Sequence, residues 1–296
     1  MPATEFALTF SEALSIFLLD RRVNNYSPKT LLHYKTLLTP FFNWSKEQGL
    51  ERIDQVTLKH VRLYLFKCSE SDFSETTVNT IARALRAFFN FCVSEEWLEK
   101  SPMHGMKMPK LPKKLPTVMS KEQVKTLLDS AESERDKVIM MFFLDCGLRL
   151  SELCNLNYQD IDLKVGKVLI RSGKGNKDRV VFVGAKTIKR LIKYFAVRGV
   201  PKPSEPLFLS DKTNERISES GVGQMLRRYE RKLGFKCNPH LLRRTFATES
   251  LRAGMDILTL QKFMGHEDIT VLKHYLLLLN DDLESAHRRF GLIDNL

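Results

Sequence analysis

Apolar side chains recur at helical spacing through the first hundred residues. The clearest series, with intervals of three or four residues, is Leu31, Tyr34, Leu38 and Phe41. Signals for helix starts precede such series. Thr9 and Glu12 have the spacing of a capping box, and Ser27 followed by Pro28 places proline at the first helical position. We therefore expect four or five helices in this part of the chain.

One of these expected helices has two contrasting faces. Its apolar face carries Val78, Ile81, Leu85, Phe88 and Cys92. The opposite face carries Asn79, Arg83, Arg86 and Asn90. Arginine and asparagine suit DNA phosphates and base edges, which makes Asn79, Arg83 and Arg86 candidate DNA contacts. A solvated outer face explains the same residues, and the pattern by itself favours that interpretation.

Residues 102–117, PMHGMKMPKLPKKLPT, interrupt the helical pattern with four prolines and several lysines. Proline stiffens the chain and removes backbone donors, so we expect a linker between two domains. Lys113 and Lys114 would suit a segment that passes close to a phosphate backbone. The predicted organisation is a helical domain over residues 1–101, a linker over 102–118 and a second domain over 119–296.

Beyond the linker, the pattern predicts helical sequence from Ser120 to about Cys146. Two short strands are expected at residues 167–172 and 179–183, around a glycine-rich turn, and helices return from residue 218 onward. The expected fold is mainly α with one small antiparallel β-sheet. It consists of a helical domain followed by an α+β domain.

Charge is the most informative feature of the composition. Lys and Arg number 47 against 35 acidic residues, giving a net charge of +12 and a pI near 9.5, and most of the excess follows residue 112. Such an excess is typical of a protein that binds a polyanion, most often nucleic acid, although lysines and arginines kept for solubility would give the same total. The sequence contains no apolar run of membrane-spanning length, no secretory signal pattern and no CxxC pair. We expect a cytoplasmic protein with reduced cysteines.

Familiar metal and nucleotide motifs are missing from the sequence. HExxH, paired CxxC and the Walker phosphate loop do not occur. Acidic clusters at residues 159–162 and 280–284 could serve a metal-dependent nuclease, but they read as an ordinary polar turn and a helix start. We therefore expect no metal and no cofactor.

The remaining candidates for chemistry include two pairs of polar residues. Arg149 follows a glycine at a helix boundary, and Glu152 comes three residues later, where a carboxylate can orient a guanidinium group. His240 and Arg243 share one face of a helix and could hold an anionic oxygen between them. Both pairs also occur on ordinary helix surfaces, so neither is decisive alone.

Three further residues complete the candidate set. Lys174 lies in the glycine-rich turn, His266 follows Gly265 at a helix end, and Tyr275 comes nine residues after the histidine. A lysine in a turn is usually solvated, and a tyrosine in an apolar helix is usually structural. The order of the five motifs is more specific than any one of them.

In this order, the motifs resemble the tyrosine recombinase family, with the nearest likeness to its Xer-type and transposon or phage integrase members. The resemblance covers essentially the whole chain. YSPKTLLHYKTLLTPFFNW is similar to the helical core-binding domain of that family, and GKGNKDRVVFVG is similar to its catalytic hairpin. The resemblance implies a two-domain clamp around duplex DNA, with a terminal helix over residues 281–296 that docks on a neighbouring protomer. Arg244 stands where the family commonly has histidine, and it is a further candidate DNA contact.

The resemblance also implies a role for each candidate residue. Tyr275 would attack a DNA phosphodiester and form a 3′-phosphotyrosyl link. The supporting set would be Arg149 and Arg243 on the non-bridging oxygens, His240 and His266 as hydrogen-bonding partners and proton carriers, Lys174 as the acid for the leaving 5′-oxygen, and Glu152 as a supporting residue.

The function that follows is site-specific DNA recombination without metal or ATP. The expected partners are double-stranded DNA and further copies of the chain, a dimer on each site and a tetramer on paired sites, in the nucleoid. A second recombinase or an accessory protein is a further possible partner. The alternatives are a non-catalytic DNA-binding regulator of the same fold and a type IB topoisomerase-like activity; a regulator would have no need of Tyr275.

Overall fold

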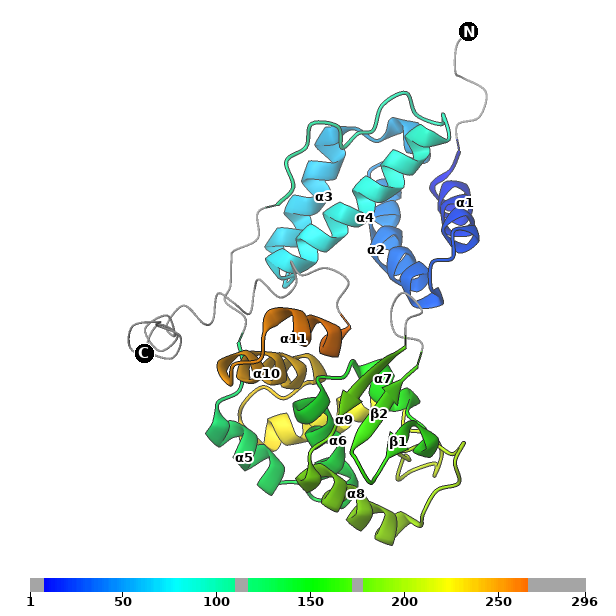
Figure 1. Ribbon diagram of the computed structural model, residues 1–296. Coiled ribbons are helices and arrows are strands. Elements are labelled where there is room, and N and C mark those ends of the chain that lie inside the picture. Colours follow the sequence, from blue (N-terminus) through cyan, green and yellow to red (C-terminus); the bar gives the residue numbers. More distant parts are fainter. Residues whose placement is uncertain (1–7, 110–116, 172–177, 266–296) are drawn as a thin grey trace, which may run out of the picture. The chain divides into compact units, whose positions relative to one another are not determined.

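The computed structural model describes residues 8–109, 117–171 and 178–265. The chain divides into two compact units, residues 1–113 and 114–296, which we call unit 1 and unit 2. Figure 1 labels the elements of both, and each unit is described by itself. Among the described residues, no helix is both long and apolar enough to cross a lipid bilayer.

Over residues 8–109, unit 1 contains four α-helices and one short 3₁₀ turn. The elements are α1 (Phe10–Val23), α2 (Pro28–Glu47), the turn Ile53–Gln55, α3 (Leu58–Glu70) and α4 (Glu75–Ser94). The local start signals explain where the first two helices begin. Thr9 and Glu12 form a capping box, in which each side chain accepts a hydrogen bond from the other's backbone N–H, and the Ser27 hydroxyl accepts from the N–H of Thr30. The four or five expected helices are confirmed.

Aromatic rings fill the core of unit 1. Phe17 of α1 meets Phe88 of α4 with ring centroids 5.6 Å apart, and Phe41 of α2 meets Phe89 of α4 at 6.1 Å. All four rings are fully buried. The buried side of α4 therefore joins α1 and α2, and burial of these large rings supplies much of the unit's stability.

Residues 103–109 pack against α4, although the sequence placed them in the linker. Met103 is buried in the core of unit 1. The Asn79 side-chain amide donates to the Pro109 carbonyl oxygen at 2.7 Å, and Arg86 Nη2 donates to the Met106 carbonyl oxygen at 2.6 Å. The side chains of Asn79 and Arg86 in α4 therefore fix residues 106–109, near the end of unit 1.

Unit 2 combines seven α-helices with a small sheet in its described part. The helices are α5 (Lys121–Asp129), α6 (Glu134–Cys146), α7 (Leu150–Asn155), α8 (Ala185–Arg198), α9 (Glu219–Leu233), α10 (Pro239–Arg252) and α11 (Ile257–Met264). The helical stretch expected from residue 120 to 146 is divided into α5 and α6, because Ser133 caps a new helix by accepting from the N–H of Asp136.

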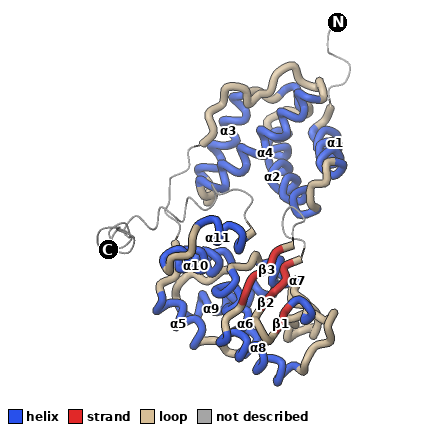
Figure 2. Tube along the Cα trace, in the orientation of Figure 1, coloured by secondary structure: helices blue, strands red, loops and turns tan. Residues whose placement is uncertain are grey.

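The sheet of unit 2 is antiparallel and has the order β1-β2-β3, as Figure 2 shows. Its strands are β1 (Ile161–Asp162), β2 (Lys167–Ile170) and β3 (Arg179–Phe182), and Ile170 pairs with Arg179 at the end of the β2–β3 hairpin where the two strands are connected. The mainly α fold with one small antiparallel sheet is confirmed.

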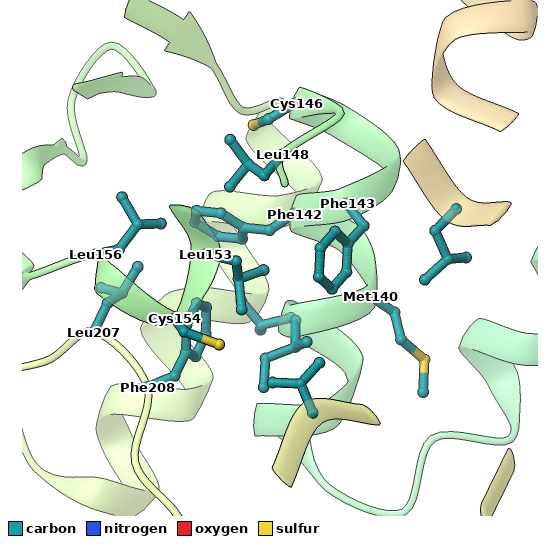
Figure 3. Packing of buried hydrophobic residues seen from close by; sticks show 14 of the residues in the cluster. Met140, Phe142, Phe143, Cys146, Leu148, Leu153, Cys154, Leu156, Leu207 and Phe208 are labelled. Carbon is teal, nitrogen blue, oxygen red and sulfur yellow. The ribbon is translucent and has the colours of Figure 1, made fainter. Parts of the chain in front are cut away.

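Helix α6 runs through the core of unit 2. Figure 3 shows Phe142, Phe143 and Cys146 of this helix among side chains from later segments, including Leu207 and Phe208. Each of these five residues is at most 1% exposed. Burial of these side chains fixes the C-terminal end of α6, from which the turn to α7 starts.

Candidate active site

The site begins with the glycine that ends α6. Gly147 has φ +57°, a left-handed conformation that side chains rarely adopt, and its N–H donates to the Phe143 carbonyl oxygen at 3.0 Å. A Cβ atom at this position would lie 2.3 Å from Cδ1 of Phe246 in α10. Only glycine therefore permits both this turn and the close approach of α10.

Arg149 and Glu152 form a local pair immediately after this turn. The Arg149 backbone N–H donates to Glu152 Oε2 at 2.7 Å, and Arg149 Nη1 donates to Oε1 at 2.7 Å. This arrangement caps α7, and it leaves the Arg149 side chain 26% exposed beside a carboxylate that is 5% exposed. Glu152 fixes the orientation of the Arg149 guanidinium group, while part of the Arg149 side chain remains exposed to solvent.

Arg179, the first residue of β3, binds the same carboxylate. Its Nη1 donates to Glu152 Oε1 and its Nη2 to Oε2, both at 2.7 Å, in the two-pronged geometry that suits a guanidinium and a carboxylate. The Arg179 side chain is only 11% exposed. Glu152 thus has a guanidinium group on each side.

Arg243 of α10 approaches from a third direction. Its Nη1 donates to the Gly147 carbonyl oxygen and lies 4.0 Å from Glu152 Oε2. Its side chain is 7% exposed. The site thus combines three arginines with one carboxylate: Arg243 from α10, Arg179 from β3, Arg149 from the α6–α7 turn and Glu152 from α7. Their net charge is positive. We call these four residues the arginine cluster.

The C-terminal end of α11 completes the arrangement. Successive carbonyl oxygens of this end each accept from a different arginine: Phe263 from Arg179 Nε at 2.9 Å, Met264 from Arg243 Nη2 at 2.9 Å, and Gly265 from Arg149 Nη2 at 2.6 Å. The last carbonyls of a helix have no intrahelical partner and carry the negative end of the helix dipole. The arginines satisfy them, so the C-terminal end of α11 is fixed at the arginine cluster.

The electrostatics of Glu152 reflect its neighbours. Burial alone raises the pKa of a carboxyl group, but the hydrogen bonds and charge of Arg179, together with hydrogen bonds from Arg149, outweigh it and lower the pKa of Glu152 to about 2. The carboxylate is therefore ionised at any pH at which the protein would work. It offsets part of the repulsion among the three arginines.

The other predicted site residues are placed as follows. His240 is exposed in the first turn of α10, one turn before Arg243, and Arg244 Nε donates to the His240 carbonyl oxygen at 3.3 Å. The remaining five predictions, Lys113, Lys114, Lys174, His266 and Tyr275, lie outside the described residues. Within the described ranges, no group of three or more His, Cys, Asp or Glu residues is arranged to hold a metal ion.

The candidate DNA contacts on α4 differ from one another. Arg83 is exposed, as expected for an outer face. Asn79 is not on that face: it is 5% exposed, because residues 106–109 cover it and Pro109 takes its hydrogen bond. Arg86 is half-buried and holds Met106 in the same way. The predicted outer face is therefore partly covered by the chain that follows α4.

Arg179 is a functional candidate that the sequence interpretation missed. It lies within GKGNKDRVVFVG, only five residues after Lys174, but the sequence around it reads as an ordinary strand start. Its partners, Glu152 and Phe263, are distant in sequence and come close only through the tertiary fold. An arginine followed directly by a run of four apolar residues in the hairpin was the local signal.

Comparison with known proteins gives consistent matches over both units. The phage integrase family model matches residues 117–280, and the model of the phage integrase N-terminal SAM-like domain matches residues 19–96. The tyrosine recombinase XerA of Pyrococcus horikoshii is 30% identical over 289 residues, which cover 97% of this chain and 96% of the relative.

Two solved structures illustrate the similarity of fold. A crystal structure of XerA recombinase is 28% identical and has a TM-score of 0.54, covering 94% of this chain and 98% of that one. The XerH site-specific recombinase bound to a palindromic difH substrate, in a post-cleavage complex, has a TM-score of 0.72 at 21% identity, covering 90% and 82% of the two chains.

Proposed function

Because this chain belongs to the phage integrase family and is a site-specific tyrosine recombinase, we propose that its arginine cluster holds a DNA phosphodiester for attack by Tyr275. The single observation that carries the assignment is the meeting of Arg149, Arg243 and the end of α11 at one place. Tyr275 follows that helix end by ten residues, within reach of the cluster.

The proposed reaction proceeds in two balanced steps. The Tyr275 phenolate attacks phosphorus, the bond from phosphorus to the 5′-oxygen breaks, and Lys174 donates the proton that the departing 5′-oxygen needs. The product is a 3′-phosphotyrosyl link and a free 5′-hydroxyl. In the second step the 5′-hydroxyl of another strand attacks the same phosphorus and gives its proton to the neutral Lys174, and the bond from phosphorus to the tyrosine oxygen breaks. The phenolate is released and the phosphodiester is restored without ATP.

The arginines supply the stabilisation that this chemistry requires. Hydrolysis of a phosphodiester is so slow that an enzyme must lower the barrier by roughly 20 kcal/mol. Negative charge grows on the non-bridging oxygens in the transition state, and each preorganised donor aimed at them contributes about 3–4 kcal/mol. Arg149 is accessible enough to meet a phosphate, and Arg243 lies beside it with a permanent charge. His240 and His266 would serve as hydrogen-bonding partners.

The proposed substrate is double-stranded DNA, in keeping with the relatives that were solved on DNA. Exposed Arg83, half-buried Arg244 and the lysines Lys113 and Lys114 would add phosphate contacts. By the same family likeness, we propose a dimer on each site and a tetramer on paired sites, in the nucleoid of the cytoplasm. A second recombinase or an accessory protein is compatible with this assembly.

The proposal is tested by trapping the covalent intermediate. The purified full chain is incubated in EDTA with a fragment library of its own genome, and SDS-resistant protein–DNA adducts are collected and their DNA ends sequenced. We expect adducts on 3′ ends that vanish in Tyr275→Phe and persist in Tyr26→Phe, a control tyrosine that is 41% exposed in unit 1. Adducts that survive Tyr275→Phe would assign the nucleophile to another residue.

A further inference from the structure

Arg179 links three segments of unit 2: the β2–β3 hairpin to which it belongs, Glu152 in α7, and the end of α11. It is the first residue of β3, next to the connection from β2, and Lys174 belongs to that connection in the sequence. Two of its nitrogens hold both oxygens of Glu152, and its Nε holds the Phe263 carbonyl oxygen at the end of α11. Each nitrogen of the guanidinium group therefore has a defined partner.

We propose that Arg179 is a positioning residue for DNA cleavage: it locks Glu152 to the end of α11 and thereby fixes the orientation of Arg149. This inference rests on the proposed function. All three guanidinium nitrogens of Arg179 are bound to Glu152 or to the Phe263 carbonyl oxygen, so we assign it no contact with DNA, and it acts through these partners. Nothing in its position requires it to bind a phosphate.

The distribution of hydrogen bonds on Glu152 explains why Arg179 controls Arg149. Each carboxylate oxygen accepts one bond from Arg149 and one from Arg179. Without Arg179, the carboxylate would keep hydrogen bonds from Arg149 alone, with Arg243 Nη1 at 4.0 Å, and it could rotate together with Arg149. Lysine cannot replace this function, since it presents a single ammonium group where arginine presents a planar fork.

The path of the backbone at Gly265 supports the same role. Gly265 has φ +62°, and a Cβ atom there would lie 3.1–3.2 Å from Cδ, Nε and Nη1 of Arg179. The chain therefore passes directly over the Arg179 side chain as it leaves α11. A displacement of Arg179 would therefore disturb the backbone at Gly265.

The competing interpretation is that Arg179 and Glu152 form an ion pair with a purely structural role. A second arginine–carboxylate pair beside the same hairpin allows a comparison. Arg171, just after β2, binds the buried Asp160 with 2.7 Å between Nε and Oδ1, but its side chain is 53% exposed. Arg171 binds this carboxylate in the sheet region and not the end of α11. Arg171 is thus a matched control for loss of an arginine–carboxylate pair from this hairpin.

The test compares Arg179→Lys and Arg179→Gln with Arg171→Lys and Arg171→Gln in the full chain. Two quantities are measured on a DNA duplex bearing the cleavage site: the single-turnover rate of adduct formation at saturating enzyme, and the Kd of the uncleaved complex. We expect both Arg179 variants to cleave about 100-fold more slowly, the loss typical of a misplacement of about 1 Å, with a Kd within about threefold of the wild type. The Arg171 variants should cleave within about threefold of the wild-type rate.

The pH–rate profile provides a readout that a structural role would not move. Glu152 faces Arg149 from the preceding turn, Arg179 from β3 and Arg243 from α10, and the carbonyl oxygens at the end of α11 accept from the same three arginines. Burial raises the pKa of Glu152, and loss of Arg179 removes the main group that lowers it. The acid limb of the Arg179→Gln profile should therefore move to higher pH.

A double substitution checks that Arg179 acts through Glu152. If it does, Arg179→Gln should add less than about twofold to the loss already caused by Glu152→Gln, because residues that act as a unit are not additive. Wild-type cleavage rates in both Arg179 variants, or a loss explained wholly by weaker DNA binding, would overturn the inference. The inference would also be overturned if the rate loss of the double variant equalled the product of the losses of the two single variants. Failure of the proposed function would look different, since the wild type would form no adduct at Tyr275.

Discussion

Replacing Glu152 by glutamine removes one negative charge from the centre of three arginines at almost constant volume. The amide would also turn N–H donors toward guanidinium groups that need acceptors. The pKa of the carboxyl falls from its ordinary value of 4.5 to about 2 in the folded protein. Since each tenfold change in a protonation equilibrium is worth about 1.4 kcal/mol, the ionised form adds about 3 kcal/mol to the stability of unit 2 at neutral pH. Loss of one member of a buried ion pair costs a similar amount, roughly 3–5 kcal/mol.

The sign of the pH dependence follows from the lowered pKa. Below pH 2 both folded and unfolded chains are protonated at this carboxyl, and the contribution vanishes. It grows as the pH rises from about 2 and is complete above about 4.5, where the unfolded carboxyl is also ionised. The difference in stability between wild type and Glu152→Gln should therefore be constant near neutral pH and shrink in acid.

The assay is urea unfolding followed by two probes that report different units. Both tryptophans, Trp44 and Trp97, lie in unit 1, so their fluorescence follows unit 1 alone. Far-UV circular dichroism follows the helices of both units. With a urea dependence of about 2 kcal/mol per molar, the part of the dichroism transition that belongs to unit 2 should move down by roughly 1.5 M, while the fluorescence midpoint stays in place.

A surface ion pair provides the control. Glu249 pairs with Arg252 at 2.8 Å with the same three-residue spacing, but these side chains are 31% and 43% exposed. Glu249→Gln should change the stability of unit 2 by less than about 1 kcal/mol, because exposed pairs are screened by water. Equal midpoints for Glu152→Gln and wild type would refute the view that this carboxylate holds the arginine cluster together.

Three further predictions concern other parts of the chain. Gly147→Ala should destabilise unit 2 by about 3 kcal/mol in the same dichroism assay, since it combines a left-handed backbone with a collision against Phe246; wild-type stability would contradict this reasoning. Asn79→Ala should speed tryptic cleavage after the exposed Lys107 several-fold, because the segment loses its tie to α4, whereas the exposed Asn90→Ala should not. The five cysteines are buried, and burial raises the pKa of each thiol, so a thiol reagent at pH 8 should label them only after urea is added; rapid labelling of the native protein would contradict the packing.

The sequence was most informative where structure depends on neighbours in the chain. The capping box at Thr9 and the serine–proline start at Ser27 predicted the first two helices, because the groups that satisfy a helix start lie within three residues of it. The same principle explains the pairing of Arg149 with Glu152. Each of these features could be formed by a short segment on its own.

Predictions that depended on distant segments were weaker. Asn79 lies on the polar side of its helix in projection, but a stretch thirty residues later covers it and accepts its hydrogen bond. Proline-rich composition suggested a linker from residue 102, although Met103 is buried in unit 1. Amphipathic periodicity shows which residues can face outward, but it does not show which of them another segment will cover.

The arginine cluster illustrates the same limit, and it also explains how such a site can exist before DNA arrives. Three guanidinium groups in one place repel one another, and a single carboxylate only partly offsets that repulsion. The end of α11 supplies the remainder, because its three terminal carbonyl oxygens need donors and carry the negative end of a helix dipole. The folding of unit 2 therefore fixes the cations in advance, which is the condition for electrostatic stabilisation of a phosphoryl transition state. A helix end has no sequence motif that identifies it as an arginine acceptor, and only the packing of α11 beside β3 and α10 gives it that role.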